Sequence, residues 1–240
     1  MAITNGVSVS DQTAPLAADS FVTALHEQAE KYHHKHPFHL LMNEGRLSRR
    51  QLQLWVANRF YYQQNIPIKD AAILSNCPYP AVRRRWLQRI IDHDGAAEGQ
   101  GGIEAWLGLA EAVGLKRSEV LEGKHVLPGV RFSVDASVTF ARTRPWIEAV
   151  AATLTELFAP DLMKERIAAF ERYYSWVDGA GLAYFRSRLT QAPRDATHAL
   201  ELVKLYCTTR PQQDRAIAAL VFKCDVLWSV LDTIHHASAD

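Results

Sequence analysis

The sequence predicts an all-α fold, a single compact bundle of about seven helices over residues 19–240. Apolar residues recur at intervals of three and four, as between Phe21 and Tyr32, which is typical of helices with one buried face. Prolines and glycines divide these segments into lengths that suit helices. No stretch alternates apolar and polar residues between turn residues, as a half-buried strand would.

Residues 1–18 are small, polar and aperiodic, and we expect a disordered leader there. The first helix begins near Asp19. After the longest helix, the segment CPYP (77–80) is a firm break, and a basic helix follows that stops at Gly95. Further helices are expected to begin at prolines, including a new one at Pro193.

The composition limits the classes of partner and compartment. Hydrophobic residues make up 48% and charged residues 22% of the chain, as in ordinary globular proteins. The formal net charge of +1 gives no overall field that attracts nucleic acid or anionic lipid. No secretory signal is visible, and no apolar segment approaches the roughly 20 residues that span a bilayer. Cys77, Cys207 and Cys224 are far apart, which suits a reducing compartment. We therefore expect a cytoplasmic protein that binds neither nucleic acid nor membrane.

The longest predicted helix begins at Ser48, a favourable N-cap, and Pro67 is expected to interrupt it. Its apolar residues outline a buried side: Leu52, Trp55, Val56, Phe60, Ile66, Ile68 and Ala71. Arg59, Tyr62 and Gln63 lie within this segment at i, i+3 and i+4, so their side chains share one face of the helix. A cation, a phenol and an amide placed together in an aromatic segment suit ligand recognition more than packing.

Other polar residues stand in apolar surroundings. Lys223 interrupts the run AALVFKCDVLWSVL, and it either reaches to water or points inward toward an anion. His93 lies between two aspartates, which are expected to raise its basicity and orient its ring. Tyr184 and Arg188 form an i, i+4 pair, either a surface arginine packed across a tyrosine ring or part of a site. Further candidates, each of which also suits a structural salt bridge, are Lys69, Arg89 and Glu156.

Internal cations, tyrosines and histidines in a helical bundle suit a buried anionic ligand, but they do not name a reaction. A metal site is an alternative for the same bundle. Glu30-x-x-His33 and Asp195-x-x-His198 match the carboxylate–x–x–His spacing of di-iron bundles. A di-iron site also needs bridging carboxylates from two other helices, and this spacing is common by chance in helical chains. The spacing alone therefore favours coincidence.

Longer motifs add a resemblance. The chain carries WVANRFYYQ, IPIKDAAI, QRIIDHDG, GGIEAWL, HVLPGVRFSVDA, TLTELFAP, YFRSRLTQA and FKCDVLW in this order. From about Phe21 to Leu231 it resembles the pyrroloquinoline quinone synthase family. The resemblance implies a haem oxygenase-like bundle, a homodimer, and an active site with neither metal nor organic cofactor. It also implies the reaction: ring closure and oxidation of a tricarboxylated bicyclic precursor by O2, which releases the quinone and hydrogen peroxide.

The resemblance further implies which residues form the site. By matching motif they are Tyr32, His33, Arg59, Tyr62, Gln63, Lys69, Arg89, His93, Glu156, Arg166, Tyr184, Arg188 and Lys223. The cations expected to hold the carboxylates of this small polycarboxylate substrate are Arg59, Lys69, Arg89, Arg188 and Lys223.

The chemistry of the implied reaction assigns roles within this set. Because O2 is a triplet and no metal is expected, the substrate itself must become an electron-rich anion, which requires a general base. We expect His93 to be that base and His33 to be a second acid–base or orienting group. Tyr184 and Arg188 are expected to stabilise reduced oxygen and developing negative charge.

Two positions depart from the family pattern. Met163 stands where a histidine can lie, and a thioether cannot donate a hydrogen bond to peroxide. Ser137 stands where a tyrosine often lies. Two alternatives to a cofactor-free oxidase therefore stay open: a metal-dependent oxidase on the same bundle, and a carrier of quinone or precursor that does not turn over.

Overall fold

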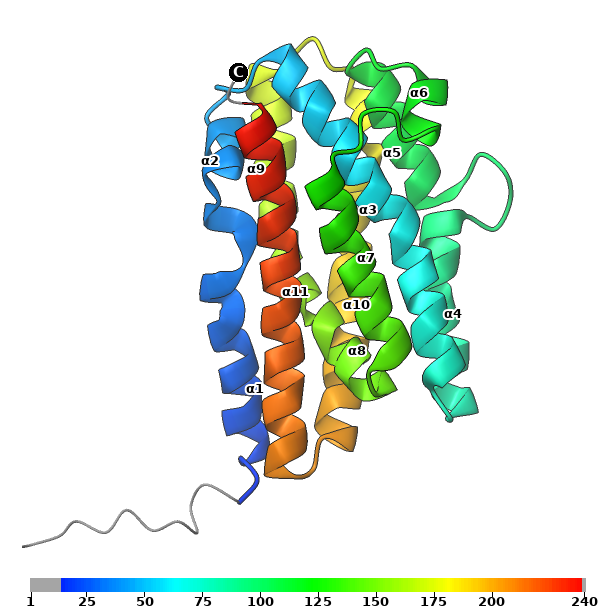
Figure 1. The fold of residues 1–240 in the computed structure, drawn as a ribbon, viewed down its shortest axis with the longest axis vertical. Helices are drawn as coiled ribbons and strands as arrows, with labels where there is room; N and C mark the ends of the chain where they lie inside the picture. The colour runs from blue at the N-terminus through cyan, green and yellow to red at the C-terminus, as the bar shows by residue number, and fades with distance from the viewer. Residues whose placement is uncertain (1–13, 239–240) are drawn as a thin grey trace, which may run out of the picture.

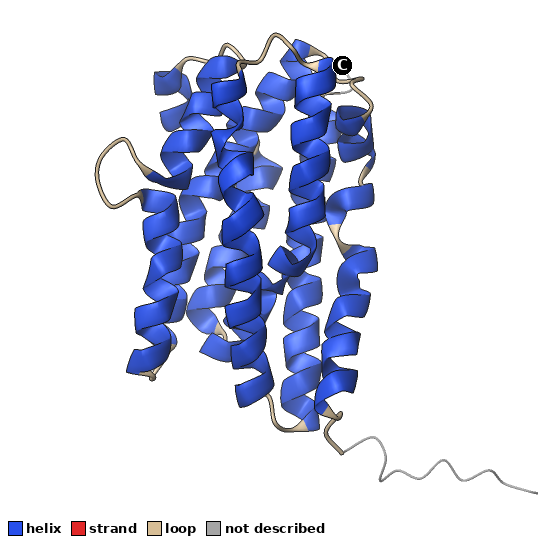
Figure 2. Cartoon of the chain, turned by 180° about the vertical axis from the view of Figure 1, so that it is seen from behind, coloured by secondary structure: helices blue, strands red, loops and turns tan. Residues whose placement is uncertain are grey.

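The computed structural model describes residues 14–238, and every regular element in that range is helical (Figure 2), which confirms the all-α prediction. The α-helices are α1 (Ala18–Glu27), α2 (Pro37–Asn43), α3 (Arg49–Asn76), α4 (Pro80–Asp94), α5 (Gly101–Ala112), α6 (Arg117–Leu121), α7 (Pro128–Thr143), α8 (Trp146–Ala152), α9 (Ala159–Tyr173), α10 (Ala183–Tyr206) and α11 (Arg210–Ala237). The 3-10 helices are η2 (Gln28–Lys31), η3 (His33–Lys35), η4 (Thr153–Phe158) and η5 (Gly179–Leu182). The helices outnumber the predicted seven because short ones such as α2, α6 and α8 are separate elements.

The long helices stand side by side around one core (Figure 1). Helix α3 packs against α4, α5 and α7, while α11 packs against α7 and α8, and α10 against α8 and α9. An aromatic cluster at the centre of the core joins four helices, α3, α5, α9 and α10. Trp55 of α3 and Trp106 of α5 lie 5.4 Å apart between ring centroids, and Phe170 of α9 and Phe185 of α10 complete the cluster. Large buried rings contribute much apolar area, so this cluster fixes the helices that carry the polar residues described below.

Helix α3 begins as predicted. The Ser48 Oγ accepts a hydrogen bond from the Gln51 backbone N–H at 3.3 Å, and the Gln51 Oε1 accepts one from the Ser48 N–H at 2.8 Å. The predicted interruption at Pro67 is wrong, because α3 continues through it to Asn76. A proline inside a helix costs about 3 kcal/mol, and packing of α3 on three neighbouring helices outweighs that cost.

Helix α10 also contains a proline. Pro193 was expected to begin a new helix, but it lies inside a helix that runs unbroken from Ala183 to Tyr206. As a result, Tyr184, Arg188 and Asp195 project from one rigid element rather than from two helices joined by a hinge.

The buried face of α3 differs from the predicted one toward its C-terminus. Ile68 and Ala71 are exposed, whereas Gln63, Pro67 and Asp70 are buried. These three follow from Phe60 at helical spacing, so the inward face continues through polar positions. The hydrophobic pattern is misleading here because the interior at this level is polar.

The first described residues already contact the bundle. Most of the predicted leader, residues 1–18, lies outside the described residues. Leu16, however, packs against the core, and its backbone N–H donates to the Gln213 Oε1 at 2.7 Å. Helix α1 begins at Ala18, next to the predicted start near Asp19, and Leu16 joins the preceding segment to α11.

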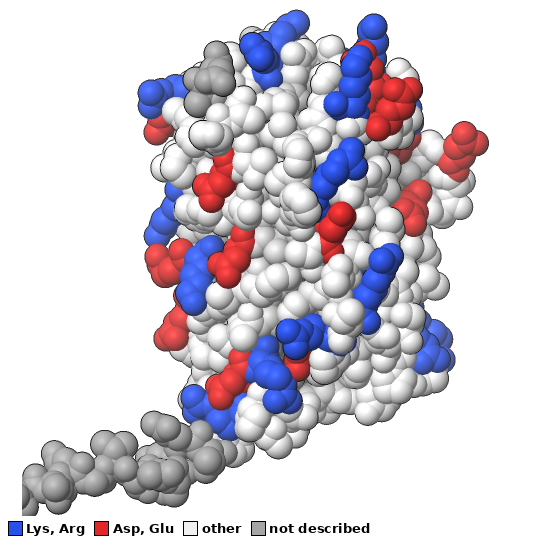
Figure 3. Space-filling model, viewed as in Figure 1, with Lys and Arg blue, Asp and Glu red and all other residues white. Residues whose placement is uncertain are grey.

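The outer surface shows no concentration of one charge on the face in Figure 3, where Lys and Arg side chains are interspersed with Asp and Glu. No helix within residues 14–238 is long and apolar enough to cross a membrane.

Candidate active site

Three small cavities adjoin one another inside the bundle. The central cavity has a volume of about 60 Å³, and its wall includes Tyr62 and Arg166. The His33 cavity, of about 20 Å³, shares Arg166 with it, and the Lys223 cavity, of about 10 Å³, shares Tyr62. All predicted site residues except Arg89 line one of the three cavities.

A wider groove of about 620 Å³ lies elsewhere, between the start of α3 and the end of α11. It contains none of the predicted site residues. Its glutamines are engaged in structure, because the Gln51 Nε2 donates to the Ser238 carbonyl at 3.1 Å and the Gln53 Nε2 to the Val113 carbonyl at 2.9 Å. The chemistry-bearing residues therefore point to the small cavities, not to the large groove.

Three cations of the cavity walls have no carboxylate partner among residues 14–238. The Arg59 guanidinium lies 3.9 Å from the centroid of the Tyr62 ring, and the Lys223 Nζ lies 4.5 Å from the same centroid. The Arg166 guanidinium lies 5.0 Å from the Trp55 ring. Burial, and next the charge of Arg59, lower the pKa of Arg166 to about 10. Aromatic faces offset only part of the cost of burying such charges.

Lys223 points inward, which decides the alternatives left open by the sequence. Its side chain is buried, and its Nζ donates to the Ser137 Oγ at 2.8 Å. Burial, and next the charge of Arg59, lower the pKa of Lys223 to about 7. Ser137, one of the two departures from the family pattern, is thus the hydrogen-bond partner of this amine.

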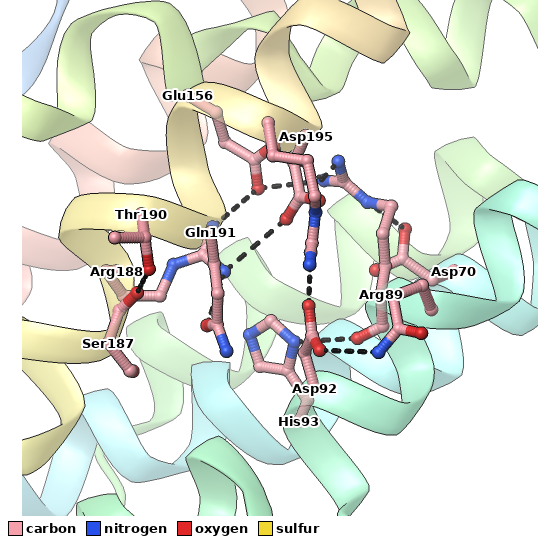
Figure 4. A network of polar contacts seen from close by, with 12 residues as sticks. Asp70, Arg89, Asp92, His93, Glu156, Ser187, Arg188, Thr190, Gln191 and Asp195 are labelled. Atoms are coloured by element: carbon pink, nitrogen blue, oxygen red, sulfur yellow. Dashed lines mark hydrogen bonds and ion pairs between the residues drawn. The ribbon is translucent and has the colours of Figure 1, made fainter.

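The other cations of the site have carboxylate partners. Glu156 accepts from the Arg89 Nη2 at 2.8 Å through both oxygens and from the Arg188 Nη2 at 3.2 Å (Figure 4). Asp195 lies 3.5 Å from the Arg188 Nη1 and 3.7 Å from the Arg89 Nη1. Burial acts to lower the pKa of both arginines, but the carboxylates outweigh it and raise the pKa of each.

Asp70 extends this network from Arg89 to Lys69, which lines the Lys223 cavity. Its Oδ1 lies 2.9 Å from the Lys69 Nζ and 3.7 Å from the Arg89 Nε, and it accepts from the Trp86 Nε1 at 3.2 Å. Burial acts to raise the pKa of Asp70, but the charges of Lys69 and Arg89 hold it below its usual value. Arg89 lines none of the three cavities, and its place between carboxylates gives it a supporting role.

The His93 ring is held with one nitrogen free. Its Nδ1 lies 3.0 Å from the Arg89 carbonyl oxygen, which can only accept, so Nδ1 carries the proton. Nε2 therefore has the lone pair, and it is buried without a partner among the described residues. Burial, and next the charge of Arg188, lower the pKa of His93 to about 4. At neutral pH this ring is an uncharged proton acceptor on the wall of the central cavity.

The expectation that the flanking aspartates raise the basicity of His93 is wrong. Asp92 pairs with Arg194 and accepts from the Gln88 Nε2 at 2.8 Å, and Asp94 is exposed. Neighbouring residues on a helix point in different directions, so neither carboxylate faces the ring.

Tyr184 faces Gln63 across the central cavity. Its O–H donates to the Gln63 Oε1 at 2.8 Å, and burial raises the pKa of the phenol. Gly102 lets the Tyr184 ring pack closely on α5, because a Cβ there would lie 3.3 Å from that ring. Both Tyr184 and Arg188 are buried, so the surface alternative for this pair does not hold.

The residues of the metal alternative are engaged differently. Glu30 is exposed and accepts from the Lys35 Nζ at 3.0 Å. Asp195 is surrounded by arginines, and His198 packs on Trp86 with ring centroids 5.7 Å apart. The described residues contain no group of three or more His, Cys, Asp or Glu placed to hold a metal ion.

Two residues of the site, His39 and Asp70, were not among the predicted ones. Asp195 was predicted only as a possible metal ligand. His39 accepts from the Arg166 Nη2 at 2.9 Å. Its only sequence signal is its place in the tract YHHKHPFH, and Asp70 has none beyond its neighbour Lys69.

Comparison with known proteins accords with this site. Residues 23–233 match the TENA/THI-4/PQQC family. The chain belongs to this family. The pyrroloquinoline-quinone synthase of Pseudomonas aeruginosa is 57% identical over 217 residues, which cover 90% of this chain and 87% of that protein. Family members of the same name from Acinetobacter baylyi and Klebsiella pneumoniae are 55% and 51% identical, covering 88% and 95% of this chain and 83% and 90% of theirs.

Solved structures share the fold. A domain of unknown function with a haem oxygenase-like fold from Shewanella denitrificans has a TM-score of 0.75 at 12% identity, covering 92% of this chain and 93% of that one. A TenA homologue from Pseudomonas syringae has a TM-score of 0.70 at 14% identity, covering 93% and 94%. The haem oxygenase-like bundle implied by the resemblance is confirmed.

Proposed function

We propose that this protein is a pyrroloquinoline-quinone synthase, which closes the last ring of a tricarboxylated bicyclic precursor and oxidises it with O2, releasing hydrogen peroxide. The observation that carries the proposal is the unpaired positive charge of Arg59, Arg166 and Lys223 around the cavities. A buried cation without a counterion is costly, and a bound tricarboxylate supplies three anions. Relatives at 51–57% identity with this name support the same conclusion.

Substrate entry requires the cavities to merge. The central cavity, of about 60 Å³, is far smaller than the roughly 300–1,000 Å³ of ligand pockets. Tyr62 and Arg59 stand where the cavities meet, stacked on each other. A carboxylate offers Arg59 a charged hydrogen bond of about 1.5–3 kcal/mol together with a counterion, whereas the Tyr62 ring offers a cation–π contact of about 0.5–2 kcal/mol and no counterion. We therefore expect Arg59 to exchange the Tyr62 ring for a carboxylate of the substrate.

His93 is suited to take a proton from the bound precursor. The ring lines the central cavity, its Nε2 lone pair has no partner among the described residues, and its Nδ1–H is fixed by the Arg89 carbonyl. In the ligand-free protein the pKa of about 4 makes it a weak base. A negatively charged substrate beside the ring favours the imidazolium and raises the pKa toward neutral pH. Deprotonation leaves an electron-rich anion, which can give electrons to O2.

Each oxidation step balances without a further reductant or oxidant. The ligand loses two electrons and two protons, and one O2 becomes one H2O2. Tyr184 and Arg188 are both buried and can donate to the reduced oxygen, which for Tyr184 requires its O–H to leave the Gln63 Oε1. Met163 lines the central and His33 cavities but cannot donate, so these two residues carry the stabilisation.

The proposal includes the remaining features implied by the resemblance. They are a reaction without metal or organic cofactor, a homodimer, and a cytoplasmic location. The three buried free thiols, Cys77, Cys207 and Cys224, suit a reducing compartment.

The test is turnover by metal-free protein. Protein dialysed against a strong chelator is mixed with the precursor and O2, and the absorbance of the quinone and the yield of H2O2 are followed, with an anaerobic sample as control. We expect many turnovers per protein. Activity that returns only when iron is added supports the metal-dependent oxidase, and one equivalent bound without turnover supports the carrier; either result contradicts the proposal.

A further inference from the structure

We infer that His39, which lines the His33 cavity, is a positioning residue that fixes His33 as a neutral N–H donor and holds Arg166 beside it. The pair then binds an anionic oxygen of the ligand, and His33 does not act as a base. This inference rests on the proposed function only for the identity of the ligand. The proton positions follow from the geometry of three buried side chains.

The first step is the contact between Arg166 and His39. The Arg166 Nη2 lies 2.9 Å from the His39 Nε2. A guanidinium nitrogen can only donate, so the His39 Nε2 must accept and carries no proton. The neutral ring of His39 therefore has its proton on Nδ1. Burial, and next the charge of Arg166, hold the pKa of His39 well below its usual value, which keeps the ring neutral.

The second step is the contact between His39 and His33. The His39 Nδ1 lies 3.0 Å from the His33 carbonyl oxygen and 3.2 Å from the His33 Nδ1. Because the His39 Nδ1 carries a proton, a second proton on the His33 Nδ1 would place two N–H groups head to head. The His33 Nδ1 must therefore accept. Burial, and next the charge of Arg59, lower the pKa of His33, so this ring is also neutral and its proton is on Nε2.

The third step concerns the two N–H groups that have no acceptor in the described residues. The His33 Nε2 and the Arg166 Nε are both buried, and neither has a hydrogen-bond partner in the described residues. By the tautomer argument both are N–H donors, and their side chains line the same cavity of about 20 Å³. Unsatisfied buried donors cost about 1–3 kcal/mol each, which a bound acceptor recovers. Two donors, one of them charged, select an anionic oxygen: a carboxylate of the substrate, or the hydroperoxide formed from O2.

The direct test reads the protons themselves. Long-range proton–nitrogen NMR correlations of ¹⁵N-histidine protein at pH 7, without ligand, assign the tautomer of each buried ring. We expect the Nδ1–H tautomer for His39 and the Nε2–H tautomer for His33. The Nδ1–H tautomer or an imidazolium at His33 would overturn the inference. Because this readout needs no substrate, it stands even if the protein makes no quinone, whereas absent turnover contradicts only the proposed function.

Variants connect the proton positions to binding. His39→Phe keeps a ring of similar size but removes both nitrogens, so the His33 tautomers should mix and product affinity should fall about tenfold. His39→Gln restores an acceptor for Arg166 and should recover part of the affinity. His36→Asn is the matched control, since His36 is buried in the same tract, contacts Asp232 instead, and caps α2 as an asparagine also does. Unchanged affinity in folded His39→Phe would contradict the inference.

The source of the anionic oxygen is separated by titration without O2. If a carboxylate is bound, the quinone product alone shifts the His33 Nε2–H resonance in the wild type. If hydroperoxide is bound, the shift requires added H2O2. A resonance that responds to neither would show that the donors serve no anionic ligand.

Discussion

His93 and His33 are both buried neutral histidines of one site, yet they hold their protons on opposite nitrogens. The partner of the His93 Nδ1 is a carbonyl oxygen, which demands a proton there and leaves the Nε2 lone pair free. The partner of the His33 Nδ1 is the N–H of His39, which demands a lone pair there and leaves an Nε2–H free. Burial is the same for both rings. The function of a buried histidine is therefore decided by the group on its other nitrogen.

The cations divide in a similar way. Arg89 is enclosed by Glu156, Asp70 and Asp195, and it stabilises the fold without lining a cavity. Arg166 is as deeply buried, but within residues 14–238 its partners are only a histidine and aromatic rings. We therefore assign Arg89 a structural role, whereas Arg166 is available to bind a ligand.

The largest expected effect tests the base. His93→Gln removes the Nε2 lone pair, and kcat should fall by about 10²–10⁴-fold while product affinity stays close to that of the wild type. His198→Gln is the matched control, because His198 is also buried with a pKa lowered to about 4, chiefly by burial, but lines none of the three cavities. Near-normal kcat in His93→Gln would remove His93 from this role. Lost activity in a folded His198→Gln would favour the metal alternative.

The next effect separates the paired from the unpaired cation. Arg89→Met removes a cation that Asp70, Glu156 and Asp195 share, although each keeps a second cation. The free energy of unfolding should fall by about 1.5–3 kcal/mol in a urea titration, because charged hydrogen bonds to Glu156 are lost. Arg166→Met strands no anion, so its stability should change little or rise. Its affinity for the product should fall by roughly 10–100-fold, because a charged hydrogen bond contributes about 1.5–3 kcal/mol. Equal losses of stability in the two variants would show that the division is not real.

Acid should weaken the folded state through the buried histidines. The pKa of His93 and of His198 is lowered to about 4, from an unfolded value of about 6.5. Between these values the unfolded chain binds more protons than the folded one, so the free energy of unfolding falls as pH drops from 6.5 to 4. Each ring contributes up to about 3 kcal/mol. Urea titrations at pH 7 and pH 5 measure the slope, which His198→Gln should reduce; a flat profile would contradict the pKa directions.

Lys223→Met should stabilise the ligand-free protein. A buried amine whose pKa is lowered to about 7 is in an unfavourable environment, and a thioether of similar length fills the space without charge. The free energy of unfolding should rise by about 1–3 kcal/mol, while affinity for the product falls. Lys223→Met that is less stable than the wild type would indicate an anionic partner within the protein. Lys204→Met on the exposed side of α10 is the control.

The sequence predicted those features that depend on local chemistry. The Ser48 cap and the break before Pro80 follow from neighbouring residues, and both are where the pattern places them. Pro67 was misjudged because packing on three helices, not local preference, decides whether a helix continues. The contact of His39 with Arg166 could not be predicted, because the two residues are 127 positions apart in the sequence. The lowered pKa of His93 could not be predicted either, because it depends on burial, whereas the flanking aspartates suggested a raised pKa.

Proton uptake on ligand binding tests most directly whether the buried cations lack anions in the free protein. In the ligand-free state the pKa of Lys223 is about 7, so at pH 8 most of the amine is uncharged, and a bound carboxylate must draw a proton onto it. Calorimetric titration of the product at pH 8, in two buffers of different ionisation enthalpy, should show a net uptake approaching one proton, and affinity should fall up to about tenfold per pH unit above 7. The uptake should vanish in Lys223→Met. Binding without proton uptake in the wild type, at an affinity independent of pH, would contradict the assignment of an uncompensated amine to the site.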